Sequence, residues 1–159
     1  MKSRTYIETT VITYLAARPA RDVVSLARQT LTRDFWAWAP TKYDVCCSEL
    51  TRIEISRDDK EAAARRLGYF ERCKLLPEFA DAADLARHLI ARKAVPPTEP
   101  EDAVHIAIAT LANAKYIVSW NFAHIVSLQA RRQLEAAILK LGYHSPLLVT
   151  PEEVYEGEA

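Results

Sequence analysis

Four polar side chains lie where the expected strands end, or on the helices beside them: Glu8, Glu54, Asp102 and Asn121. Glu8 comes at the end of the run 4–7, and Asn121 follows the run 116–120. A parallel sheet binds its ligands beyond the carboxyl ends of its strands, so positions more than a hundred residues apart in the chain can converge there. Converging carboxylates repel one another, and a divalent cation removes that repulsion. Hard oxygen donors of this kind favour Mg²⁺ or Mn²⁺.

Two of these acids have competing structural roles. Glu8 could act as a cap for a helix beginning at Thr9, although Glu is a poor cap, and a carboxylate at a buried strand end needs a partner. Asp102 could serve as an acid in the first turn of a helix. However, Thr98 and Glu101 form a Thr-x-x-Glu pattern typical of a capping box, which leaves Asp102 free for another role.

The remaining candidates are ambiguous from pattern alone. Glu54 could be an ordinary solvated acid, although isoleucines flank it on both sides. Asn121 could be a turn residue. His105 and His124 are interpreted as structural, because a lone histidine beside apolar residues is more often hydrogen-bonded core than ligand. The residue patterns therefore leave both interpretations open for Glu54 and Asn121.

Strands are expected at 5–8, 44–48, 73–76, 115–120 and 146–149, with helices at 9–17, 22–38, 58–70, 79–92, 99–113 and 130–141 and a short helix carrying Glu54. The helix at 22–38 has an apolar stripe that begins at Val23 and ends at Trp38. Strands that alternate with helices predict an α/β fold, a three-layer α/β/α arrangement around a central parallel sheet of about five strands. We expect one domain over residues 1–151 and a loosely held C-terminal tail over residues 152–159.

Composition narrows the class of protein further. The chain has 159 residues and equal numbers of acidic and basic side chains, 21 each, which argues against a protein that coats nucleic acid non-specifically. It has only three glycines, and none forms a glycine-rich phosphate-binding turn. Cys46, Cys47 and Cys73 are expected to be reduced and buried. With no apolar run long enough for a membrane helix or a signal peptide, we expect a cytoplasmic protein that does not associate with membranes.

Taken in order, the motifs resemble the PIN domain, the nuclease fold of VapC-type toxins in bacterial toxin–antitoxin systems. The resemblance covers nearly the whole chain, and its segments are 6–12, Ser48 with Glu54, 100–109, 117–125 and 146–153. The family usually has Asp at its first and fourth acidic positions. The chain resembles a variant branch with Glu at the first position, Glu8, and Asn at the fourth, Asn121.

The resemblance implies a Mg²⁺- or Mn²⁺-dependent endoribonuclease, and it implies a homodimer and, for a toxin, an antitoxin protein that blocks the site. Its four positions map to Glu8, Glu54, Asp102 and Asn121, with Ser119 and Thr9 supporting the ligands or the substrate. Glu8 and Asp102 would bind the metal directly, and Glu54 would bind it or orient the attacking water. Asn121 would position a metal-bound water or the phosphate, with weaker metal binding than an aspartate would give.

Two other functions remain as alternatives. One is a catalytically weak PIN-like module that binds RNA or a partner protein without cutting, which the unusual residues Glu8 and Asn121 favour. The other is a purely structural or interacting α/β domain, which would be favoured if the acids lay on the outer surface. Mutation of Asp102 separates these alternatives from the nuclease, because only the nuclease has a cleavage activity to lose.

Overall fold

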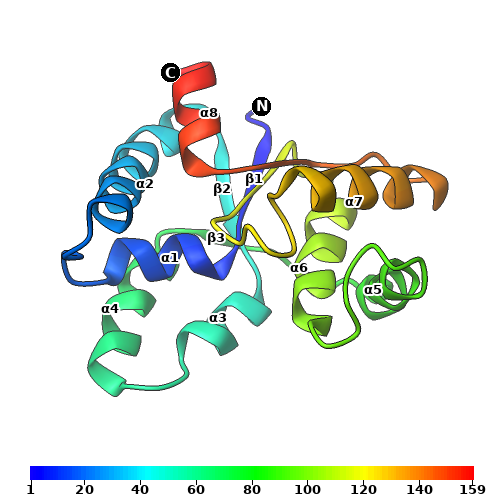
Figure 1. Ribbon diagram of the computed structural model, residues 1–159, viewed down its shortest axis with the longest axis horizontal. Coiled ribbons are helices and arrows are strands. Elements are labelled where there is room, and N and C mark those ends of the chain that lie inside the picture. Colours follow the sequence, from blue (N-terminus) through cyan, green and yellow to red (C-terminus); the bar gives the residue numbers. More distant parts are fainter.

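The computed structural model describes residues 1–159, and its centre is a single five-stranded parallel sheet (Figure 1). Its strands are β1 (Arg4–Ile7), β2 (Asp44–Cys47), β3 (Lys74–Leu75), β4 (Tyr116–Val118) and β5 (Leu147–Val149). They lie in the order β3-β2-β1-β4-β5, and every neighbouring pair is parallel. The expected α/β class and the five parallel strands are therefore confirmed.

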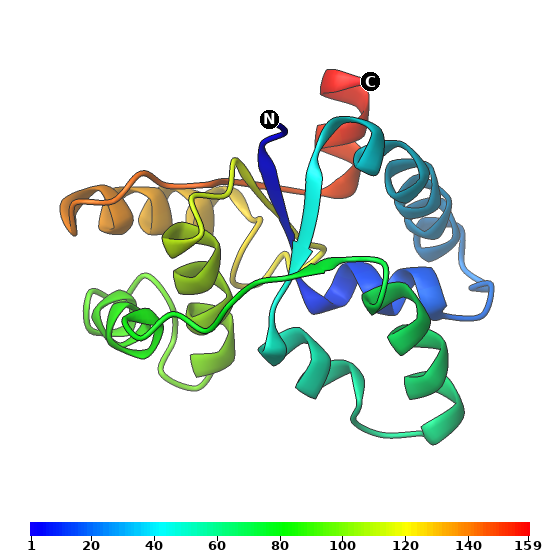
Figure 2. The same cartoon turned by 180° about the vertical axis from the view of Figure 1, so that it is seen from behind.

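Eight helices cover the two faces of the sheet: α1 (Thr9–Ala16), α2 (Val23–Lys42), α3 (Glu49–Ile55), α4 (Lys60–Phe70), α5 (Ala82–Ala91), α6 (Pro100–Leu111), α7 (Leu128–Lys140) and α8 (Pro151–Glu158). Figure 1 and the reverse view in Figure 2 place α1, α2 and α4 on one side, with α5, α6 and α7 on the other. This is the expected three-layer arrangement, which follows because parallel strands need crossover connections that cover both faces. No helix is both long and apolar enough to span a membrane.

The strands divide their side chains between two hydrophobic cores, one on each face. Tyr6 and Cys46 belong to the core under α5, α6 and α7, whereas their chain neighbours Ile7 and Cys47 belong to the opposite core. This alternation is the two-residue period of a strand. All three cysteines are free; Cys46 and Cys47 are buried as expected, and Cys73 is half-buried.

The buried face of α2 differs from the expected apolar stripe. Val23 and Val24 are 83 % and 58 % exposed, and the buried residues of the helix are Gln29, Thr32, Phe35, Trp36 and Ala39. The two polar members have partners. The Gln29 side chain bonds the loop before α2 through Arg18 O at 2.9 Å, and Thr32 accepts a bond from the Trp120 indole at 2.9 Å. Satisfied polar groups are buried at little cost, so hydrophobicity alone selects the wrong face.

The C-terminal tail is ordered, which corrects the expectation that residues 152–159 are loosely held. Residues 151–158 form α8, which Thr150 and Glu153 cap reciprocally in a capping box. Val154 is buried in the core shared with α2, and the Tyr155 ring packs edge-on against Trp38. The tail therefore completes one helical layer.

Candidate functional site at the carboxyl edge of the sheet

The strand order places a topological switch point between β1 and β4. From β1 the chain first builds β2 and β3 on one side, and then returns to build β4 and β5 on the other. The connections leave in opposite directions at this point, and open α/β sheets bind their ligands beyond the carboxyl ends of the strands at such a point. Glu8 follows β1 directly and Ser119 follows β4 directly, so both residues stand at the switch point.

Glu8 is held by hydroxyl groups at this point. It is 4 % exposed, and its Oε1 accepts hydrogen bonds from Ser119 Oγ at 2.7 Å, the Thr10 backbone N–H at 3.1 Å and the Thr10 hydroxyl. Glu8 is also the N-cap residue of α1. The capping role considered for it is therefore compatible with its position at the switch point. All of these bonds fall on one carboxylate oxygen, which leaves Oε2 without a protein hydrogen bond.

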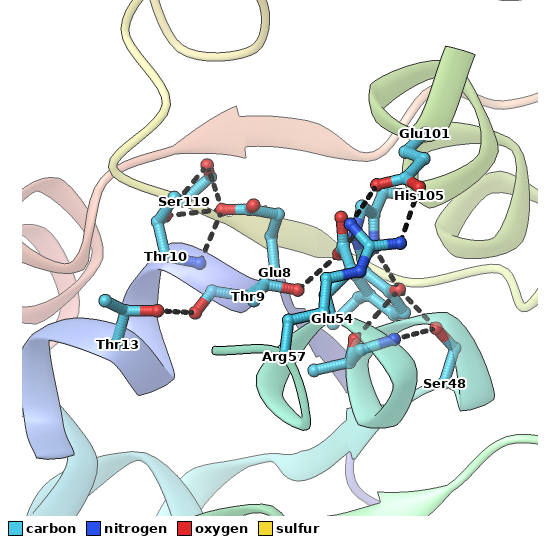
Figure 3. Close-up of polar contacts among 12 residues, drawn as sticks. Glu8, Thr9, Thr10, Thr13, Ser48, Glu54, Arg57, Glu101, His105 and Ser119 are labelled. Atoms are coloured by element: carbon cyan, nitrogen blue, oxygen red, sulfur yellow. Dashed lines mark hydrogen bonds and ion pairs between the residues drawn. The ribbon is translucent and has the colours of Figure 1, made fainter. Parts of the chain in front are cut away.

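Glu54 lies on α3 and belongs to a second network, shown beside the first in Figure 3. Its Oε1 accepts bonds from the Thr9 hydroxyl at 2.6 Å and from His105 Nε2. The other ring nitrogen of His105, Nδ1, is 2.6 Å from the Tyr6 hydroxyl, which in turn bonds Ser48 Oγ at 2.7 Å. His105 is fully buried, so its interpretation as hydrogen-bonded core is confirmed.

The network fixes the ionisation of Glu54. Burial acts to raise the pKa of Glu54, but the hydrogen bond and charge of His105 outweigh it and lower that pKa to about 2. Burial alone would lower the pKa of His105, and its bond to Glu54 raises it instead. Glu54 is therefore an anion paired with a histidine that readily carries the balancing proton.

Asp102 lies in the first turn of α6, and its Oδ2 is shielded from solvent without any hydrogen-bond partner. Burial raises the pKa of Asp102, and the nearby charge of Glu8 adds to this, whereas Asn121, His124 and His105 act in the opposite direction. A carboxylate oxygen buried without a partner carries a desolvation cost of a few kcal/mol. Asp102 is thus the one member of the four selected residues with a buried oxygen that has no hydrogen-bond partner.

Asn121 begins the turn after β4. Its Oδ1 accepts a bond from the His124 backbone N–H at 3.0 Å, and its own backbone N–H donates to Ser119 Oγ at 2.9 Å. Asn121 is therefore a turn residue, as one of the two interpretations expected. Its side chain also lies near Asp102 and acts to lower the pKa of that acid, so a turn role and a place beside Asp102 are compatible.

The structure adds two residues to those selected from the sequence. Glu99, Asp102 and His124 each offer one donor atom, and these atoms all lie within 4.8 Å of one another. Glu99 is not among the candidates selected from the sequence, and His124 is interpreted there as structural. Glu99 and Asp102 are three residues apart at the start of a helix, a spacing that puts them on one face and could have indicated the pair. His124 comes from the β4–α7 loop, and only the fold brings it there.

The expected capping box at the start of α6 is absent. Glu99 is the cap residue, and no side-chain bond caps this helix. Glu101 instead forms an ion pair with Arg57 at 2.9 Å, which links the start of α6 to the end of α3. Because Arg57 and Glu101 are far apart in the chain, local sequence cannot reveal this ion pair.

The four selected residues and their supports thus form two adjoining groups. Glu8, Asp102, Asn121 and Ser119 are mutually close through the contacts and charge effects given above. Glu54 is joined to them through Thr9 and His105. Of the three selected acids, only Asp102 belongs to the donor group with Glu99 and His124; Glu8 and Glu54 lie outside it. No protein-family model matches the chain, and no curated protein is detectably similar to it in sequence.

Proposed function

We propose that the protein is a metal-dependent endoribonuclease of the PIN type that hydrolyses RNA phosphodiester bonds. The observation that carries the proposal is Asp102, whose Oδ2 is buried without a partner beside Glu99, His124 and the charge of Glu8. A cation bound there would complete the coordination of this oxygen and neutralise the surrounding acids. Glu8 and Asp102 remain the first choice of direct ligands at the switch point.

The donor set fits a divalent cation. Carboxylates accept Mg²⁺ and Mn²⁺ alike, but an imidazole nitrogen suits Mn²⁺ better than the harder Mg²⁺. With His124 in the group, we expect Mn²⁺ to bind more tightly than Mg²⁺. The bound ion would supply Lewis-acid stabilisation of the phosphate and a more acidic water.

The chain's own residues would hold this arrangement in place. Ser119 and Thr10 orient Glu8 by hydrogen bonds to a single oxygen, which leaves Oε2 without a protein hydrogen bond and available to a cation. His105 keeps Glu54 ionised, and Glu54 is thereby suited to orient the attacking water by a hydrogen bond. With a pKa lowered to about 2, Glu54 is a weak proton acceptor. Asn121 would position the phosphate or a water without adding charge. Cleavage would then proceed by in-line attack on phosphorus.

The biological setting follows from the PIN resemblance. As the toxin of a type II pair, the protein would act on cytoplasmic RNA, form a homodimer and be blocked by an antitoxin protein. The exposed valines at the start of α2 offer apolar surface for such contacts. Light scattering of the purified chain tests the dimer directly, since a monomer at micromolar concentration would contradict it.

Cleavage of total RNA and of defined single-stranded oligonucleotides, compared in Mn²⁺, Mg²⁺ and EDTA, tests the proposal. Asp102→Asn should abolish cleavage, and Asp34→Asn, which changes an exposed acid on α2, should not. Thermal unfolding gives a second readout, because Mn²⁺ at about a hundred times its Kd should stabilise the wild type by about 2.7 kcal/mol. That stabilisation should be lost in Asp102→Asn and reduced in His124→Ala. Metal-dependent cleavage that survives Asp102→Asn would contradict the assignment.

A binding module that does not cut is the second candidate. The engagement of Glu8 Oε1 by three hydrogen bonds and of Glu54 by His105 favours it, because it leaves fewer free oxygens than a two-metal nuclease needs. In that case folded protein would bind RNA or a partner, no metal would support cleavage, and Asp102→Asn would leave binding intact.

A further inference from the structure

Two adjoining cavities lie beside the candidate metal group. The larger, about 630 Å³, is formed by the end of α5, the α5–α6 loop and the first turns of α7, and His124 lines it. The smaller, about 310 Å³, shares Lys93 and Gln133 with the first and continues along α7 to Lys140. Together they form one groove, called here the α7 groove, that leads from His124 along α7 to Lys140.

The α7 groove has no acidic residue in its lining, although 21 of the 159 residues are Asp or Glu. Its charged side chains are Arg92, Lys93 and Lys140, and none of them forms an ion pair within the chain. Elsewhere several basic residues are neutralised, as Arg57 is by Glu101 and Arg131 is by Glu153. The groove is therefore a local site for an anion in a chain with no net charge.

The backbone at Lys93 adds an independent observation. Lys93 has φ of 60° at the end of α5, where the Ala94 N–H bonds back to Leu89 O at 3.0 Å. This left-handed position is normally occupied by glycine, because a side chain is strained there. The other two non-glycine residues with positive φ are Asp58 and Asn113, types that tolerate this conformation. Lys93 thus stands at the junction of the two cavities in a conformation that favours glycine, and the backbone itself gives no reason for a lysine there.

The larger cavity also suits the size and chemistry of a nucleotide. Ligand pockets for small molecules span roughly 300–1,000 Å³, and a predominantly apolar wall with a few polar groups is typical. Here Val95, Pro96 and Pro97 supply the apolar wall, and Gln129 and Gln133 supply amides that can bond the edge of a base. Gln129, Gln133, Ala136 and Lys140 follow one another along α7 at helical spacing, so the lining is continuous.

We propose that the α7 groove binds the RNA strand on one side of the phosphate that is cut. One nucleotide occupies the larger cavity beside His124, and the following phosphates lie along Lys93, Arg92 and Lys140. This inference rests on the proposed ribonuclease function and deepens it, because it assigns the path of the substrate and the residues that grip it.

Equilibrium binding of a fluorescein-labelled single-stranded RNA in EDTA tests the groove without cleavage. We expect Lys93→Glu to weaken binding at least tenfold, and Lys2→Glu, an equal charge change before the amino end of β1, to leave it nearly unchanged. Replacing Arg92, Lys93 and Lys140 together by Ala should make the dependence of log K on log salt shallower by about two, since single-stranded nucleic acid contributes roughly 0.7 per neutralised phosphate. An unchanged slope would overturn the proposal.

Lys93→Gly separates binding from folding. Glycine relieves the positive φ, so the variant should melt about 2–4 °C higher than the wild type while binding RNA more weakly. A loss of binding in a more stable protein cannot result from unfolding. Lys93→Gly that binds RNA as tightly as the wild type would show that the lysine has no role in binding.

The outcomes of the two proposals are distinguishable. If the wild type cuts RNA with Mn²⁺ but the groove variants bind normally, the substrate path is wrong and the nuclease stands. If the wild type binds RNA through the groove but no metal supports cleavage, the groove stands and the nuclease fails. Inorganic phosphate that competes with the RNA at millimolar or lower concentration would show that the groove recognises a free anion rather than a strand, which also overturns the assigned path.

Discussion

The Ser119 hydroxyl donates a hydrogen bond of 2.7 Å to the Glu8 carboxylate across the switch point of the sheet. The two residues are 111 positions apart in the chain, and each directly follows the last residue of its strand. Ser119 Oγ also accepts the Asn121 backbone N–H at 2.9 Å, so one hydroxyl positions both Glu8 and the turn that carries Asn121.

Ser119→Ala should therefore loosen two predicted site residues at once. A buried hydrogen bond to a charged group contributes about 1.5–3 kcal/mol, so we expect a loss of about 2 kcal/mol in the free energy of unfolding. Urea unfolding measures this, with the exposed Ser3→Ala as the matched control. RNA cleavage by Ser119→Ala should fall more than its stability loss accounts for, because Glu8 is less well oriented. Equal activity would show that Thr10 alone positions Glu8.

His105→Gln tests how much the ion pair between His105 and Glu54 contributes to stability. Removing one partner of a buried ion pair typically costs about 3–5 kcal/mol, because the remaining charge is left unpaired, although Glu54 retains some solvent contact and its bond from Thr9. We expect a loss near the lower end, about 3 kcal/mol, by urea unfolding in EDTA. His88→Gln, which changes an exposed histidine on α5, should cost less than 0.5 kcal/mol.

The His105–Glu54 pair also predicts how the free energy of unfolding depends on pH. The pKa of His105 is raised above its usual 6.5, so its stabilisation is complete below pH 6.5 and is lost as pH rises through the higher folded value. The pKa of Glu54 is lowered from 4.5 to about 2, so its contribution is complete above pH 4.5 and is lost as pH falls towards 2. The stability difference between wild type and His105→Gln should be larger at pH 5.5 than at pH 9. A difference that is constant between these pH values would contradict a charged pair.

Asn121→Asp adds a fourth acid to Glu8, Glu54 and Asp102. The turn should be retained, because a carboxylate oxygen can accept the His124 N–H as the amide oxygen does. The added charge beside Asp102 should strengthen Mn²⁺ binding about tenfold by calorimetry, and lower the melting temperature in EDTA through repulsion. If metal affinity and cleavage both stay unchanged, Asn121 has no part in the metal site.

Val154→Ala tests the contribution of α8. The side chain is 2 % exposed in the core beneath α2, and removing two buried methyl groups there should cost about 2 kcal/mol. Leu139→Ala, at a position on α7 that is 71 % exposed, should change the free energy of unfolding by less than 0.5 kcal/mol. If Val154→Ala is as stable as the wild type, α8 does not pack as the structure has it.

The sequence by itself determined the class of fold, because alternating apolar strands and helices permit few arrangements other than a parallel sheet covered on both faces. It also placed Glu8 and Asn121 after strands and Asp102 at a helix start, since these positions depend only on where local elements end. Cys46 and Cys47 were correctly assigned to buried sites by the same local argument.

Only the tertiary structure decided the partners of these residues. The pairing of His105 with Glu54 and of Arg57 with Glu101, and the proximity of His124 to Asp102, join elements that are distant in the chain. The buried face of α2 and the packing of α8 against it were likewise unpredictable, because each depends on what the opposite surface offers. A side chain's role is set by the charge and hydrogen bonds that surround it, and those come from the fold rather than from neighbours in sequence.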